Sequence, residues 1–235
     1  MKRALLPRFS GRVLPGLAVL PAILVIAGAA HAELLFEDQG AGKLGTQPCG
    51  GQGCWTNYAR VVDVDGDGDL DLVAVNSGGF FDPNPQAQPL TIYTNDGTGN
   101  FTNGSALIGN FSGAVRQVAF GDVDGDGDLD MYAPAADQSQ PDALFIFNAG
   151  AFANEAATRL PAGLSSDAGA TRFGDVDNDG DLDLFVANGY EGPDGVALYL
   201  NDGAGVFAVG GSVPTTLTGA DPDDIDLADF DGDFD

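Results

Sequence analysis

Aspartate recurs at every second position in a nine-residue segment of this 235-residue chain. The segment "DVDGDGDLD" occupies residues 63–71 and 122–130, and "DVDNDGDLD" occupies residues 175–183. Carboxylates so close together repel one another, by about 1 kcal/mol per pair at 4 Å in water and several-fold more where water is scarce. The chemistry that fits such a segment is the binding of a hard cation, which takes six to eight oxygen ligands.

Each segment offers oxygen ligands at alternate positions, which we number from 1 to 9. We expect carboxylates from positions 1, 3, 5 and 9 and a backbone carbonyl from position 7. The candidate ligands are Asp63, Asp65, Asp67, Asp69 and Asp71; Asp122, Asp124, Asp126, Asp128 and Asp130; and Asp175, Asp177, Asp179, Asp181 and Asp183. Glycine or asparagine at positions 4 and 6 permits the left-handed backbone of a tight coil. Leucine at position 8 is expected to anchor the loop in the sheet.

Calcium suits these ligands better than magnesium, which tolerates crowded protein cages poorly. The segments are not EF-hands, because that motif has a glutamate at position 12 and this chain has alanine or valine there. We expect about three structural calcium ions. The alternative is that the segments are solvated acidic turns, in which aspartate and glycine are common.

A fourth, imperfect copy of the segment, "DFDGDFD", occupies residues 229–235. It retains Asp229, Asp231 and Asp233 at positions 1, 3 and 5, but it has phenylalanine at position 6 and no position 9. These three aspartates are therefore weaker candidates for metal ligands.

The four copies begin 59, 53 and 54 residues apart, a period typical of stacked units such as propeller blades. In each of the first three units, one apolar strand pattern precedes the acidic segment and a second follows it. A third, such as "LTIYTN" (90–95), leads into a glycine turn such as "NDGTGNF" (95–101). Asparagine and glycine tolerate the positive φ that hairpins need. Each unit therefore predicts four antiparallel strands, which make one blade.

These acidic segments and the "NDGxGxF" hairpins resemble the FG-GAP/VCBS repeats of integrin-α-like β-propellers and many secreted bacterial proteins. The resemblance implies a propeller with calcium between the first two strands of each blade, and no single activity. We expect an all-β β-propeller of four-stranded antiparallel blades, about three complete and one partial, from a larger propeller. The predicted repeats are 58–112, 113–168, 169–222 and 223–235.

Residues 1–32 have the features of a secretory signal peptide: four basic residues, an apolar run and "AHA" before the expected cleavage site. The alternative is an uncleaved membrane anchor, although two prolines interrupt the run. Cleavage predicts a protein that is secreted, periplasmic or at the cell surface, with no membrane span. Residues 33–57 then form an N-terminal segment in which Cys49 and Cys54 are expected to form a disulfide.

After residue 32 the chain keeps five basic residues against 35 acidic ones, a net charge of −30. Such a protein is repelled by nucleic acid and by anionic lipid. The only histidine, His31, lies in the predicted signal peptide, which excludes Ser-His-Asp catalysis and His-ligated zinc in the mature chain.

We expect a non-enzymatic binding or adhesion module for an extracellular glycan or protein. Phe80, Phe81 and Tyr190 lie in loops opposite the acidic segments, where they suit ligand contact or, equally, packing against the fold. The alternative is the propeller of a secreted carbohydrate-active enzyme. A lyase needs a base and a charge neutraliser, which five basic residues supply poorly, whereas a hydrolase with paired carboxylates stays open.

Overall fold

The computed structural model describes eight stretches of the chain: residues 43–44, 54–78, 86–136, 140–162, 164, 168–188, 195–213 and 224–228. The predicted signal peptide, Cys49, the aromatic candidates Phe80, Phe81 and Tyr190, and the acidic segment 229–235 lie outside these residues. The predictions that depend on them, including the disulfide, stay predictions. Within the described stretches, no helix has the length and apolar character needed to cross a membrane.

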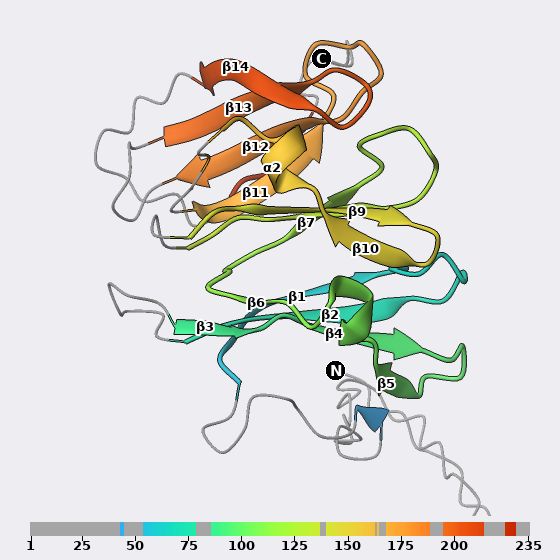
Figure 1. Ribbon diagram of the computed structural model, residues 1–235. Helices are drawn as coiled ribbons and strands as arrows, with labels where there is room; N and C mark the ends of the chain where they lie inside the picture. Colours follow the sequence, from blue (N-terminus) through green and yellow to red (C-terminus); the bar gives the residue numbers. More distant parts are fainter. Residues whose placement is uncertain are drawn as a thin grey trace, which may run out of the picture. The chain divides into compact units, whose positions relative to one another are not determined.

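The described residues form three antiparallel sheets (Figure 1). The first contains β1 (Thr56–Val62), β2 (Asp71–Gly78), β3 (Gln86–Pro89), β4 (Thr91–Asn95), β5 (Phe101–Asn103) and β6 (Ser112–Gly113). The second contains β7 (Ala119–Gly121), β8 (Asp130–Ala133), β9 (Ala143–Asn148) and β10 (Ala151–Asn154). The third contains β11 (Ala168–Gly174), β12 (Asp183–Asn188), β13 (Gly195–Asn201) and β14 (Phe207–Val213). Two short helices, η2 (Ser105–Ile108) and α2 (Ala156–Arg159), come after β5 and β10.

In each sheet four strands follow one another as an antiparallel meander. The second and third sheets have the orders β7-β8-β9-β10 and β11-β12-β13-β14. In the first sheet the corresponding four strands are β1, β2, β4 and β5. The short strand β3 pairs with the end of β2, and β6 pairs with β3. Each meander is one four-stranded blade, which confirms the predicted all-β, partial-propeller fold. The short strands β3 and β6 were not predicted, because they are polar and too brief to show a period.

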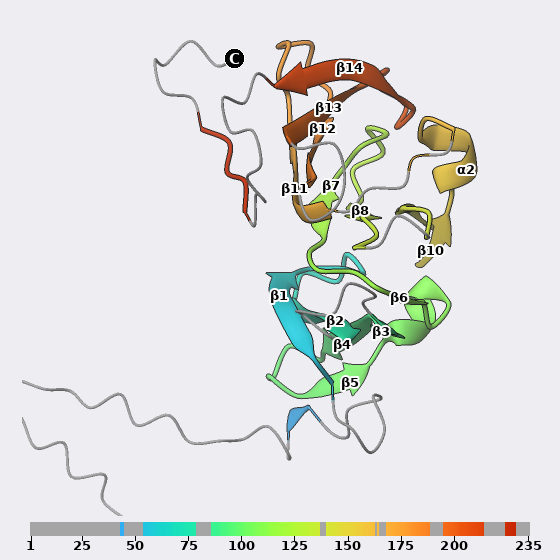
Figure 2. The ribbon, with the colours of Figure 1, turned by 90° about the vertical axis from the view of Figure 1, so that its left-hand side faces the viewer.

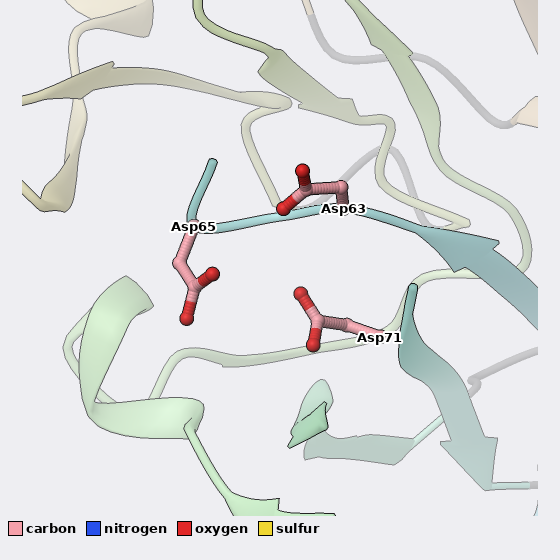
Figure 3. Close-up of side chains that lie close together, drawn as sticks. All are labelled: Asp63, Asp65 and Asp71. Carbon is pink, nitrogen blue, oxygen red and sulfur yellow. The ribbon is translucent and has the colours of Figure 1, made fainter. Parts of the chain in front are cut away.

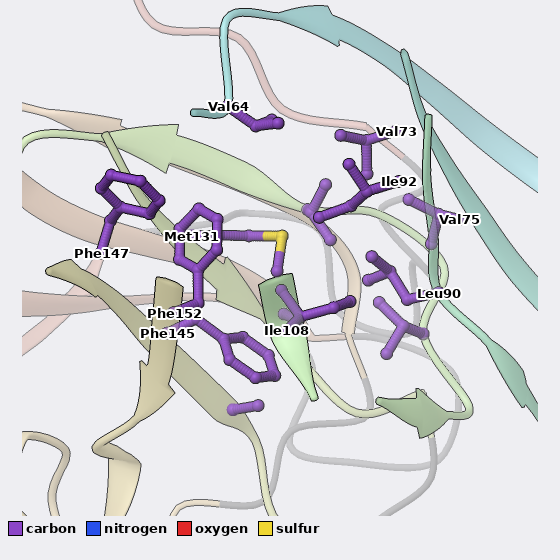
Figure 4. Packing of buried hydrophobic residues seen from close by; sticks show 14 residues of the cluster. Val64, Val73, Val75, Leu90, Ile92, Ile108, Met131, Phe145, Phe147 and Phe152 are labelled. Atoms are coloured by element: carbon purple, nitrogen blue, oxygen red, sulfur yellow. The ribbon is translucent and has the colours of Figure 1, made fainter. Parts of the chain in front are cut away.

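The strand β8 shows how the second blade packs between its neighbours, because its successive side chains join different apolar clusters. All four residues of β8 are buried. Met131 belongs to an apolar cluster with Ile92 of the first blade, and Tyr132 belongs to another cluster with Leu184 of the third. Figure 4 shows Met131 among side chains of the first two blades. Successive side chains of a strand point to opposite faces of its sheet. Because both faces of β8 are covered, the strand does not alternate between buried and exposed residues.

Strand register places the acidic segments. The first and second strands of the three blades end their pairing at Val62↔Asp71, Gly121↔Asp130 and Gly174↔Asp183. Position 9 is therefore the first residue of the second strand in each blade, and positions 1 to 8 form the connecting loop. The helix α2 follows β10 at the edge of the second blade (Figure 2).

Candidate metal centres

Three of the five candidate ligands converge in each acidic loop. They are the aspartates at positions 1, 3 and 9, which form the groups Asp63, Asp65 and Asp71; Asp122, Asp124 and Asp130; and Asp175, Asp177 and Asp183. In each group one carboxylate oxygen from each residue lies within 4.8 Å of the others. Figure 3 shows the carboxylates of the first group gathered around a common space. Oxygens at these separations can bind a single ion.

The aspartate at position 1 closes the loop on itself. Asp63 accepts hydrogen bonds from the backbone N–H of Gly66 on Oδ1 and of Gly68 on Oδ2, both at 2.9 Å. The second and third loops repeat the bond from position 6, at 3.0 Å in both. Gly68 has a φ of 92°, a conformation that glycine adopts at little cost. Glycine at position 6 therefore allows the amide to point at the carboxylate.

The aspartate at position 9 joins the loop to the sheet. Asp71 is fully buried and accepts hydrogen bonds from the N–H of Val64 on Oδ2 and of Asn95 on Oδ1, both at 2.8 Å. Asp130 and Asp183 make the same two bonds, at 2.8–3.0 Å. Sequence reasoning gave this residue only a ligand role and missed its structural one. Each carboxylate oxygen keeps a second lone pair for an ion.

Positions 5 and 7 bond to each other. Asp67 is exposed, and its Oδ1 accepts a hydrogen bond from the N–H of Asp69 at 2.9 Å. The other two loops have the same bond, at 2.9 and 3.0 Å. These aspartates are not among the three that converge, so their predicted part in metal binding stays a prediction.

The predicted anchoring by leucine at position 8 is wrong for the first loop, where Leu70 is 58% exposed. In the third loop the leucine reaches the preceding blade instead. A Cβ on Gly121 of β7 would stand only 2.7 Å from Leu182 Cδ1. The absence of a side chain at Gly121 leaves room for this contact.

Negative charge in the loops is poorly neutralised. Burial raises the pKa of Asp65, and the carboxylates of Asp71 and Asp67 raise it further. Burial also raises the pKa of Asp130 to about 6. Two carboxylate oxygens, Asp65 Oδ1 and Asp124 Oδ1, are buried without a hydrogen-bond partner. Such an oxygen is costly to bury. A hard divalent cation would both satisfy it and neutralise its charge, so the donor set fits calcium.

An asparagine at the start of the glycine turn holds the first and third acidic loops against a hairpin. Asn201 Nδ2 donates to the carbonyl of Leu182 at 3.1 Å and to that of Val123, in the preceding blade, at 2.8 Å. Asn95 makes the corresponding bond within the first blade, to Leu70 O at 3.0 Å. Sequence reasoning treated these residues only as turn formers. The available signal was that "NDG" begins this turn in the first and third units, whereas the second unit has "NAG".

A family model described as an FG-GAP-like repeat matches residues 63–133 and 175–235, more than half of the chain. Both matched stretches begin at position 1 of an acidic loop. No curated protein matches the chain. The repeat match, the three four-stranded blades and the three aspartate groups agree with one another, and the chain belongs to the FG-GAP repeat family.

Proposed function

We propose that this protein is a secreted β-propeller module, stabilised by calcium, that binds an extracellular glycan or protein and catalyses no reaction. One observation carries the calcium part. Three carboxylates converge in each of three loops, and in two of those loops one carboxylate oxygen is buried with no hydrogen-bond partner. Membership of the FG-GAP family supports a propeller module, and the fold by itself implies no activity.

Positions 1, 3 and 9 would hold calcium in each loop, and a bound ion supplies the positive charge that the carboxylates lack. The residues themselves connect the ion to the fold. Position 1 closes the loop, and position 9 bonds to the start of the loop and to the end of the third strand. Without neutralisation the carboxylates repel one another across these same bonds. We therefore expect calcium to stabilise whole blades as well as loops.

A cavity of about 500 Å³ at the second blade supports a binding role. It lies at the end of the variable segment 133–142, between Pro141 and Asp142 on one side and Ala156 and Leu160 on the other. The buried Asp142 accepts a hydrogen bond from the hydroxyl of Tyr132 at 2.7 Å, so this wall is already ordered. The volume falls within the roughly 300–1,000 Å³ of ligand pockets.

The basic residues support binding over catalysis. The chain after residue 32 has no histidine and only five lysines and arginines. Two of these, Arg159 and Arg172, already form ion pairs with acidic side chains. Residues 33–235 therefore offer no histidine for proton transfer and few cations to neutralise a sugar acid.

Differential scanning calorimetry tests the calcium proposal. Sites with a Kd of about 0.1–1 mM, common in extracellular modules, would each add about 1.4–2.7 kcal/mol of stability at 10 mM free calcium. We expect a higher Tm in calcium, its reversal by chelator, and a smaller rise in magnesium. An unchanged melting curve in calcium would contradict the metal assignment.

Glycan and protein arrays, followed by a polysaccharide panel assayed for both binding and bond cleavage, test the binding role. We expect retention of a ligand without release of products. Cleavage of a glycosidic bond by the chain would show that it is an enzyme and would overturn the proposal.

A further inference from the structure

Arg159, the last residue of α2, brings a positive charge to the second acidic loop. Its Nη2 lies 3.3 Å from Asp124 Oδ2, and its Nε lies 2.6 Å from Glu155 Oε2. Its Nη1 donates to the backbone carbonyl of Ala204, in the hairpin turn of the third blade. The Arg159 and Asp124 side chains are only 18% and 16% exposed. Water therefore screens this ion pair less than an exposed one.

The hairpin turn of the third blade has the shape that this contact requires. Gly205 has a φ of 73°, and a Cβ there would stand 2.5 Å from Arg159 Nη1 and 3.3 Å from Asp124 Cβ. Only glycine allows the turn, the guanidinium and the acidic loop to approach so closely. The bond from Asn201 Nδ2 to Val123 O holds the same turn against the same loop.

The first and third loops have no equivalent partner in the described part of the chain. There, no ion pair joins Asp65 or Asp177 to a basic side chain. In the first blade the helix after the fourth strand is η2, "SALI", which has no charged residue. A cavity of about 370 Å³ lies beside Asp65, lined by Ala106 and Leu107 of η2 and by Gly150 of the next hairpin. The first loop thus has open space where the second has a guanidinium.

We infer that Arg159 is a resident counter-cation of the second loop and makes its calcium site weaker than those of the first and third loops. The inference rests on the proposed calcium binding. The guanidinium of Arg159 pairs with Asp124 Oδ2, so the buried Asp124 Oδ1 is the oxygen that can bind an ion. A divalent ion on Oδ1 is then repelled by the nearby positive charge. The same charge partly neutralises the loop in the absence of calcium. The three sites are therefore unequal, although their sequences are almost identical.

Calcium titration of the full chain by isothermal calorimetry tests this inference. We expect two ions to bind about tenfold or more tightly than the third, since a unit charge a few ångströms away has an effect of this order. Substitution at position 3 assigns the sites. Asp124→Asn is expected to remove the weak site, whereas Asp65→Asn and Asp177→Asn are each expected to remove a tight one.

Two variants of Arg159 separate the effect of its charge on calcium affinity from the effect of its shape, and a variant of Arg60 is the control. Arg159→Gln is expected to raise the affinity of the weak site about tenfold. Arg159→Lys keeps the charge and is expected to keep the site weak. Arg60→Gln removes the same charge from an exposed arginine of β1 and is expected to change every site by less than about twofold, because exposed charges are screened.

The outcomes distinguish this inference from the calcium proposal. Three equal sites, or a weak site that survives Asp124→Asn, would overturn the role of Arg159 and leave calcium binding intact. A folded Arg159→Gln variant whose weak site is unchanged would do the same. A chain that binds no calcium would overturn both.

Discussion

The aspartate at position 9 is expected to stabilise the blade even without metal, and Asp71→Asn tests this. Both oxygens of the buried Asp71 accept backbone hydrogen bonds, at 2.8 Å each. An asparagine can replace only one of these acceptors, and its amide would turn a donor toward a backbone N–H. One charge-assisted bond is worth about 1.5–3 kcal/mol, and a buried donor left unsatisfied costs about 1–3 kcal/mol. We expect a net loss of about 3 kcal/mol.

The assay is thermal and urea unfolding in excess chelator, so that the ligand role of Asp71 does not contribute. For a chain of this size, about 3 kcal/mol corresponds to a Tm lower by roughly 6–12 °C. Asp67→Asn is the matched control. It removes the same charge from the same loop, but Asp67 is exposed and its single accepted bond can be kept by an amide oxygen.

Both variants remove one charge from the loop, but only Asp71→Asn also disrupts backbone hydrogen bonds to a buried carboxylate, so the difference between them tests these bonds. If the chelated Asp71→Asn protein unfolds within about 1 kcal/mol of Asp67→Asn, the aspartate at position 9 is a metal ligand and nothing more.

Two further substitutions test the hairpin and the loop backbone by urea unfolding. Asn201→Ala removes the bonds that Nδ2 donates to Leu182 O and Val123 O and the bonds that Oδ1 accepts from the N–H of Gly203 and Gly205. The residue is 8% exposed, and we expect a loss of about 2–4 kcal/mol. A loss below about 1 kcal/mol would argue against a bridge between blades. Gly68→Ala places a Cβ in open space at a φ of 92°, so only backbone strain contributes, and we expect a loss of about 1–2 kcal/mol in chelator. Unaltered stability of Gly68→Ala would mean that the loop relaxes without the left-handed conformation.

The sequence alone predicted the blades and the position of the candidate site in each. Apolar strand patterns, acidic segments and glycine turns are local signals, and they recur at a fixed period. The structure confirms three four-stranded antiparallel blades. It also brings together the aspartates at positions 1, 3 and 9 of each segment. The reach of one short loop is enough for these side chains to meet, so their convergence follows from local spacing.

Only the tertiary structure decided which neighbours each loop has. Arg159 meets Asp124 and Ala204, residues that are 35 and 45 positions away in the chain. Asn201 meets Val123, which is 78 positions away. Position 8 faces solvent at Leu70 but lies against the preceding blade at Leu182. These contacts depend on how one sheet packs on the next, and the repeat pattern of the sequence does not specify this packing. The three acidic segments are nearly identical in sequence but have different neighbours. Those neighbours decide how far the negative charge of each loop is neutralised, as Arg159 does for the second loop.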